Sequence, residues 1–136
     1  MIPSPVVGLH CILEMYGCQS ELLNNEAFVR QALTEAADQG MSTLLGLTSH
    51  AFEPQGVTAL ALLAESHISM HTWPEAGYAA VDVFTCGTTA QPQLACAFLV
   101  EQFQAGDHTL RQLSRGMNVV SQHKDHEEVA LCLDRN

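Results

Sequence analysis

Apolar residues recur in two different rhythms along this chain, and each rhythm predicts one kind of element. Short apolar runs separated by turn-forming residues predict strands, which we expect at residues 6–14, 42–50, 57–64, 78–86 and 108–113. The second and third strands flank the turn residues 52–56, so they should form an antiparallel hairpin. One further strand could lie between residues 64 and 78, but the pattern does not define its bounds. The tail is expected to form a loop at 122–128 and a short edge strand at 129–133.

Helical spacing occurs in two segments. Residues 20–39 place their apolar side chains on one stripe, and Gly40 follows where a helix-ending glycine belongs. Residues 92–104 repeat the pattern, with Pro92 suited to a first turn. The order β-α-β-β-(β)-β-α-β predicts an α+β fold: a two-layer sandwich with a mainly antiparallel sheet and helices on one face. We expect a single domain over residues 1–136.

The composition of the chain indicates which kinds of partner it could bind. Hydrophobic residues make up 47% of the chain and charged residues 15%, a balance that favours an obligate oligomer. The formal charge of −10 would repel a phosphate backbone, so no nucleic acid is expected as a partner. No apolar run has the roughly 20 residues of a membrane-spanning helix, and the first residues lack the pattern of a secretory signal. We therefore expect no membrane contact and a cytoplasmic location.

The five cysteines are an odd number without a C-x-x-C pair, which favours reduced thiols over a disulfide framework. Cysteine and histidine do not recur at zinc-finger spacing, so no metal is predicted.

The densest group of reactive side chains lies between residues 65 and 87. The hydroxyl of Ser66 could attack the carbonyl of the peptide bond before it, giving an ester that eliminates to dehydroalanine and hydrolyses to a pyruvoyl group. This reaction needs a base, and His67 and His71 are the nearby candidates. The plainer alternative is that Ser66 only begins a turn. In the same way, Cys86 could simply be a small buried apolar residue, although it shares a strand face with Asp82.

A series of short motifs resembles the bacterial S-adenosylmethionine decarboxylase proenzymes. They are Gly8-Leu9-His10, Tyr16-Gly17-Cys18, Glu65-Ser66-His67, His71-Thr72-Trp73-Pro74-Glu75, Gly77-Tyr78-Ala79-Ala80 and Asp82-Val83-Phe84-Thr85-Cys86-Gly87. The resemblance is most specific between residues 65 and 87, and we judge it weak after Gly87.

The resemblance implies self-cleavage between Glu65 and Ser66, giving a β chain (1–65) and an α chain (66–136). Ser66 would become the pyruvoyl cofactor, whose carbonyl forms a Schiff base with the substrate amine. His71 matches the proton acceptor of processing, and Cys86 matches the acid that protonates the substrate carbon after decarboxylation. The product would serve spermidine synthesis.

Two further residues match substrate contacts in that family. Phe52 corresponds to an aromatic that stacks on adenine, and Glu75 to the carboxylate that holds the ribose hydroxyls. Turn packing and simple solvent exposure are their alternatives. The chain also departs from the family pattern: Leu9 replaces an arginine, Thr58 replaces a serine that assists processing, and Ala76 replaces an aromatic.

Spacing adds a geometric requirement. In an extended segment, Ser66 and His71 would lie roughly 16 Å apart. Either the chain folds back, or Thr58 and His71 serve the Ser66 of a partner in a homodimer with shared sites, as the resemblance implies. Two functional alternatives stay open: a pyruvoyl decarboxylase acting on ornithine or arginine, and an unprocessed, non-catalytic binding or regulatory homologue.

Overall fold

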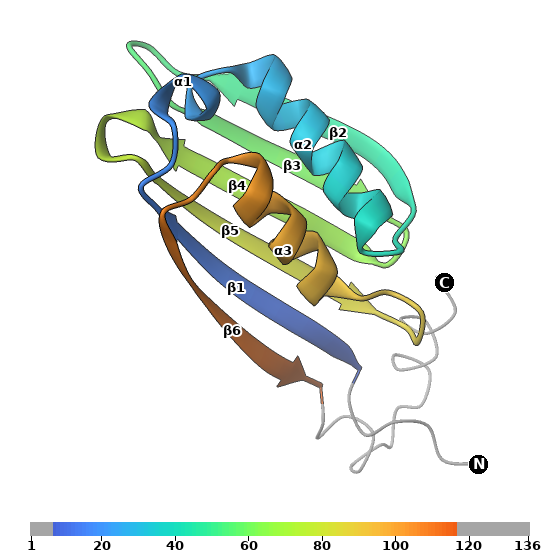
Figure 1. Cartoon of the computed structure of the whole chain (residues 1–136). Coiled ribbons are helices and arrows are strands. Elements are labelled where there is room, and N and C mark those ends of the chain that lie inside the picture. Colours follow the sequence, from blue (N-terminus) through green and yellow to red (C-terminus); the bar gives the residue numbers. More distant parts are fainter. Residues whose placement is uncertain (1–6, 117–136) are drawn as a thin grey trace, which may run out of the picture.

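The computed structural model describes residues 7–116. Its sheet has six strands in the spatial order β2-β3-β4-β5-β1-β6, and every neighbouring pair is antiparallel (Figure 1). The strands are β1 (Gly8–Tyr16), β2 (Leu44–Ala51), β3 (Val57–Leu63), β4 (Ser66–Trp73), β5 (Tyr78–Cys86) and β6 (Asp107–Arg115). The predicted residues 122–128 and 129–133 lie outside the described part of the chain.

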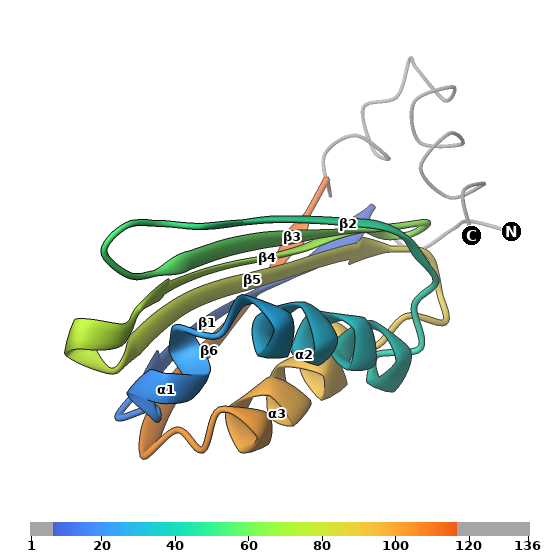
Figure 2. The ribbon, with the colours of Figure 1, turned by 90° about the horizontal axis from the view of Figure 1, so that it is seen from above.

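The helices α1 (Ser20–Leu23), α2 (Glu26–Gln39) and α3 (Pro92–Gln102) all pack on the same side of the sheet (Figure 2). A short 3-10 helix, η1 (Pro74–Ala76), joins β4 to β5. The predicted two-layer α+β sandwich with helices on one face is confirmed. No helix in residues 7–116 has the length and apolar character needed to cross a membrane.

The helix expected over 20–39 is in fact two helices. Asn25 lies between them, and its side chain accepts a hydrogen bond from the Phe28 amide at 3.0 Å, which caps the start of α2. The neighbouring Asn24 accepts the Gly56 amide at 2.9 Å, which ties this break to the turn between β2 and β3. Because asparagine side chains compete for backbone amides, the continuous apolar stripe did not produce a continuous helix.

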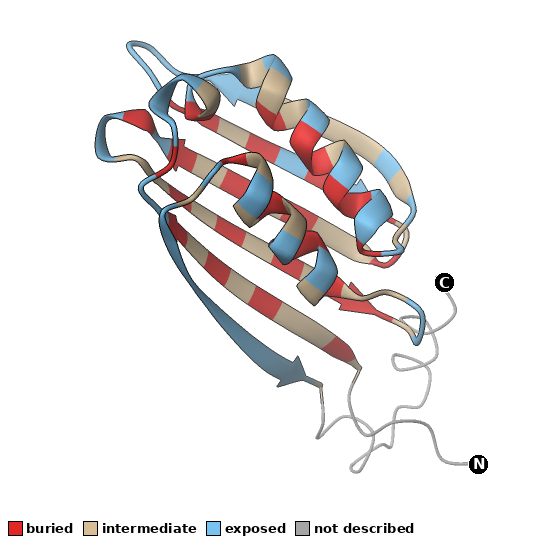
Figure 3. Cartoon of the chain, in the orientation of Figure 1, coloured by how far each residue is buried: buried red, intermediate tan, exposed pale blue. Residues whose placement is uncertain are grey.

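The core lies between the sheet and the helices. Residues that alternate along β1, β3, β4 and β5 point into it, which gives the banded burial pattern in Figure 3. Phe103, at the end of α3, is fully buried and meets the ring of Phe28 edge-on, with centroids 5.2 Å apart. All nine residues of the edge strand β6 are exposed.

The strand left open in the sequence reading is β4, and it is central to the sheet. Only two residues, Ala64 and Glu65, separate it from β3, and Leu63 pairs directly with Ser66 across this hairpin. Ser66 therefore begins a strand rather than a loop.

We call the sheet surface opposite the helices the open face. By alternation with buried neighbours, it carries His67, Ser69, His71 and Trp73 of β4. It also carries several exposed apolar side chains, among them Tyr16, Leu60, Leu62, Trp73 and Leu113. Leu9 alternates with His10 and so lies on the other side of β1, which places the missing arginine away from this face.

Candidate active site

The Glu65–Ser66 peptide bond lies in the tight turn between β3 and β4, and hydrogen bonds fix the residues before it. The side chain of Glu65 is 5% exposed and accepts the Thr43 amide at 2.9 Å. The amide of Ala64 donates to the Thr43 carbonyl, also at 2.9 Å. Thr43 therefore fixes the turn through hydrogen bonds to both Ala64 and Glu65.

The backbone of Ser66 has a φ of 148°, a region that residues with a side chain rarely adopt. Such conformations cost about 1–3 kcal/mol and persist only where the surroundings impose them. Here the pairing of Leu63 with Ser66 and the Thr43 contacts impose it. The strain lies at the bond that the sequence analysis marks for cleavage, so cleavage would release it.

The carbonyl oxygen of Glu65 accepts two hydrogen bonds from one residue. The amide N–H of Cys86 donates to it at 2.9 Å, and the Cys86 thiol donates at 3.3 Å. These donors lie where negative charge would develop on the oxygen during attack on the carbonyl carbon, as in an oxyanion hole. Cys86 reaches this position because its neighbour Thr85 pairs with Ser66 across β4 and β5.

At the start of β4, the hydroxyl of Ser66 lies 3.1 Å from Nδ1 of His67. The opposite ring nitrogen, Nε2 of His67, lies 3.2 Å from Oδ2 of Asp82 on β5. A serine, a histidine and a carboxylate therefore form a continuous hydrogen-bonded series beside the Glu65 carbonyl.

Asp82 is the centre of this polar cluster. Its carboxylate also accepts hydrogen bonds from Ser69 and from Nε2 of His10, the latter at 2.9 Å. Burial raises the pKa of Asp82, but the hydrogen bonds from Ser69, His10 and His67 outweigh burial and hold the pKa below its ordinary value. Asp82 is therefore a carboxylate, an acceptor only, at neutral pH.

A second cluster lies at the other end of β4. The hydroxyl of Thr58 is 2.5 Å from Nδ1 of His71, across the β3–β4 pair. The His71 ring also contacts Trp73, with centroids 4.2 Å apart, and Phe52, with centroids 5.7 Å apart. Glu75 follows in η1 and is exposed. Thr58, Phe52, His71 and Trp73 form what we call the distal cluster.

The structure thus separates the predicted site residues into two groups. Ser66, Glu65 and Cys86 meet at the turn between β3 and β4, which we call the cleavage turn after the cleavage that the resemblance implies. Thr58, His71 and Phe52 meet five residues further along β4. Because β4 is a regular strand, Ser66 and His71 of one chain lie roughly 16 Å apart. The fold-back alternative is wrong for this chain.

The sequence reading gave no role to His10 or Asp82 and only a candidate role to His67. A signal for Asp82 existed, since a charged residue shares its strand face with Cys86. Nothing in the sequence paired Asp82 with His10, which is 72 positions away.

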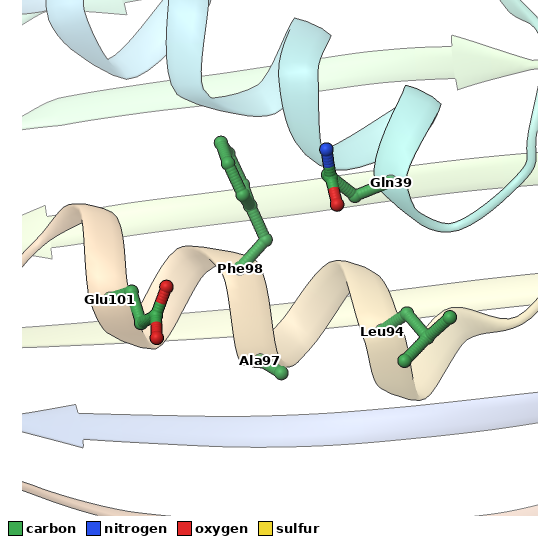
Figure 4. Close-up of a pocket in the computed structure, with 5 residues that line it drawn as sticks. All are labelled: Gln39, Leu94, Ala97, Phe98 and Glu101. Atoms are coloured by element: carbon green, nitrogen blue, oxygen red, sulfur yellow. The ribbon is translucent and has the colours of Figure 1, made fainter.

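Within residues 7–116, no group of three or more histidine, cysteine or acidic side chains is arranged to hold a metal ion. A hollow of about 230 Å³ lies on the helical side, lined by Gln39, Leu94, Ala97, Phe98 and Glu101 (Figure 4). It shares no residue with the cleavage turn or with the distal cluster.

Comparison with known proteins agrees with this geometry. The model of a family described as S-adenosylmethionine decarboxylase matches residues 9–116. An S-adenosylmethionine decarboxylase proenzyme of Parasynechococcus marenigrum is 59% identical over 110 residues, which cover 81% of this chain and 86% of the relative. A proenzyme of the same name from Caldicellulosiruptor saccharolyticus is 41% identical over 111 residues, covering 82% and 90%.

Among solved structures, the adenosylmethionine decarboxylase of Aquifex aeolicus superposes with a TM-score of 0.78 at 33% identity, covering 83% of this chain and 93% of that one. Fold, cleavage turn and relatives together define a decarboxylase proenzyme. The chain belongs to the S-adenosylmethionine decarboxylase family. The likeness extends to residue 116, well beyond Gly87, where the motifs suggested that it fades.

The matches support decarboxylation of S-adenosylmethionine as the activity, within polyamine biosynthesis. They do not favour ornithine, arginine or a non-catalytic role.

Proposed function

We propose that this chain cleaves itself between Glu65 and Ser66 into a β chain (1–65) and an α chain (66–136), and that residue 66 becomes a pyruvoyl group. The observation that carries this proposal is the Glu65 carbonyl, which accepts both the amide and the thiol of Cys86 next to the strained residue Ser66. A carbonyl polarised by two donors is more open to attack by a neighbouring hydroxyl.

The residues present fit such a group. A pyruvoyl group supplies an electron sink for loss of a carboxylate from a bound amino acid. Residue 66 is partly exposed at the start of β4, one of the strands that form the open face. A small substrate could therefore reach it. The Cys86 thiol lies at the same turn and can deliver a proton to the carbon that lost its carboxylate.

We propose that the working unit is a homodimer whose open faces meet. Five exposed apolar side chains on this face, at Tyr16, Leu60, Leu62, Trp73 and Leu113, support the pairing. Two sheets packed face to face would bury these side chains. Such packing can also bring the distal cluster of one chain to the cleavage turn of the other.

In this dimer, His71 of one chain would accept the Cα proton of residue 66 in the partner once the ester has formed. Thr58 would hold the His71 ring through the 2.5 Å hydrogen bond to Nδ1, so Nε2 would be the nitrogen that accepts the proton. The extra methyl group that distinguishes Thr58 from a serine therefore leaves the hydrogen bond in place.

We propose that the nucleoside of the substrate binds at the distal cluster. Phe52 is 42% exposed at the end of β2 and could stack on adenine, and Glu75 is exposed in η1 where it could accept the ribose hydroxyls. Phe52 contacts the His71 ring, and η1 follows the end of β4 that is farther from Ser66, so each substrate would contact two subunits.

We place the enzyme in the cytoplasm because its thiols suit a reducing compartment. Cys11 and Cys96 are both buried in the core, and neither forms a disulfide in the part of the chain that the structure describes.

Intact mass measured under denaturing conditions tests the cleavage. The expected result is two fragments, with the second lacking a free amino group at residue 66, and release of CO₂ from carboxyl-labelled S-adenosylmethionine but not from ornithine or arginine. A purified, folded chain that remains at 14.8 kDa under active conditions would contradict the proposal.

Sharing between subunits has its own test. Chains carrying Ser66→Ala and chains carrying His71→Ala are each expected to stay uncut alone. When the two are co-expressed, some His71→Ala chains should mature, because a Ser66→Ala partner supplies an intact His71. If co-expression yields no more cleavage than either variant alone, the shared site is wrong.

A further inference from the structure

Next to the scissile bond, His67, Asp82 and His10 form a hydrogen-bonded group, in which only His67 has been named so far, as one candidate base. Resting on the self-cleavage proposed above, we propose that His67 is the base that activates Ser66 for attack on the Glu65 carbonyl, with Asp82 and His10 as the residues that position it. All of these groups belong to one chain, so the first stage of maturation needs no partner.

The hydrogen bonds fix the direction of proton transfer. Arg115 can only donate, and its Nη1 lies 3.1 Å from Nδ1 of His10, so that nitrogen accepts. His10 therefore carries its proton on Nε2 and donates it to Asp82 at 2.9 Å. Arg115 is itself held over the Phe84 ring, 4.9 Å from the ring centroid.

The same reasoning applies to His67. Asp82 is a carboxylate and accepts at Oδ2, so Nε2 of neutral His67 must donate to it. Nδ1 of neutral His67 then carries a lone pair, and it faces the Ser66 hydroxyl at 3.1 Å. A serine, a histidine and a carboxylate in this order have the roles of a nucleophile, a base and an orienting group, as in the serine hydrolases.

The step balances within the chain. As the bond between Ser66 Oγ and the Glu65 carbonyl carbon forms, the hydroxyl proton moves to Nδ1 of His67. The developing oxyanion is held by the two donors of Cys86. When the carbon–nitrogen bond breaks, His67 returns the proton to the Ser66 nitrogen, which leaves an ester at Oγ and a free amine.

His71 cannot take this role in the same chain, because it lies roughly 16 Å from Ser66 along β4. The two histidines are thus assigned to successive stages: His67 to formation of the ester, and His71 of the partner to its elimination. Substitution of each should therefore stop maturation at a different chemical species.

The test follows freshly translated chains over time, with and without neutral hydroxylamine, which cleaves esters but leaves amides intact. His67→Ala is expected to slow cleavage by about 10²–10⁴-fold and to remain an amide that resists hydroxylamine. In His71→Ala, the ester should instead accumulate, and hydroxylamine should cleave the chain at this ester. His108→Ala, at an exposed histidine of β6, is the matched control and should mature normally.

Two further measurements distinguish a chemical role from a structural one. Added imidazole should restore cleavage of His67→Ala, and Asp82→Asn should slow the formation of the ester by at least about tenfold, because an amide would no longer fix the ring of His67. Circular dichroism confirms that each variant is folded.

The inference is overturned if folded His67→Ala forms the ester at the wild-type rate, or if imidazole fails to restore cleavage while Asp82→Asn matures normally. If the wild-type chain itself never cleaves, the proposed function fails instead, which is a distinguishable result.

Discussion

The thiol of Cys86 lies 3.3 Å from the carbonyl oxygen of Glu65, the same oxygen that accepts the Cys86 amide at 2.9 Å. One residue therefore contacts the Glu65 carbonyl through its backbone and through its side chain. Substitution of the side chain removes one donor and leaves the other.

For this reason, Cys86→Ala should affect the two reactions unequally. Self-cleavage is expected to slow by about tenfold, the effect of one lost hydrogen bond of roughly 1.4 kcal/mol. Decarboxylation per cleaved α chain should fall by about 10²–10⁴-fold, because the proposed proton donor is gone. Electrophoresis measures the first reaction and CO₂ release the second. Cys86→Ser, which keeps a donor but is a weaker acid, should recover cleavage more than decarboxylation; equal losses in both reactions would argue against two separate roles.

The contact between Thr58 and His71 predicts a defect in the later stage of maturation. Thr58→Val keeps the shape of the side chain but removes the hydroxyl at 2.5 Å from Nδ1. We expect the ester to accumulate and its elimination to slow by about tenfold. Thr58→Ser keeps the hydroxyl and should mature at least as fast as wild type. Mass spectrometry after hydroxylamine treatment reports the ester, and normal maturation of Thr58→Val would show that this hydrogen bond is dispensable.

A charged substitution on the open face should prevent dimer formation without preventing the chain from folding. Leu62 is 54% exposed on this face, so Leu62→Glu should fold but place a charge in the proposed dimer interface. The variant is expected to elute as a monomer and to stop at the ester, because we propose that His67 acts in its own chain and His71 on the partner. Leu94→Glu, at a residue 43% exposed on the helical side, is the control and should remain dimeric and active. A monomeric Leu62→Glu chain that matures fully would contradict the assignment of His71 to the partner.

Tyr78 provides a prediction in alkali. Its hydroxyl donates to Glu14, and this hydrogen bond, together with burial and the nearby negative charge, raises the pKa of Tyr78 to about 12. A raised pKa means that the stabilisation is complete below the ordinary value near 10 and is lost as the pH rises through about 12. Thermal melts should therefore show a fall in stability across this window that Tyr78→Phe lacks. Absorbance titration of the two tyrosines measures the pKa of Tyr78 directly. Two transitions near pH 10 would contradict the hydrogen bond between Tyr78 and Glu14.

Much of the fold could be predicted from the sequence, because strands and helices follow from the spacing of apolar residues within each segment. Alternation along 78–86 predicts Asp82 on the face away from the core residues Val81 and Val83, as the structure has it, whereas Cys86 at the strand end is buried. The break between α1 and α2 was missed, because the apolar stripe continues through two asparagines whose caps decide the helix boundary. The sequence does not clearly predict β4, because its outward-facing positions hold histidine and serine, which are not among the residues enriched in strands.

The sequence by itself determined the two-layer architecture, the faces of most strand residues and, through its motifs, the family. Tertiary structure alone decided which reactive side chains meet. β1 lies between β5 and β6, and this order brings His10 to Asp82 and Arg115 to His10 across separations of 72 and 105 residues. Local propensity cannot encode such pairings, because they depend on which strands hydrogen-bond across the sheet. The regular geometry of β4 likewise decided that Ser66 meets His67 and not His71 within one chain.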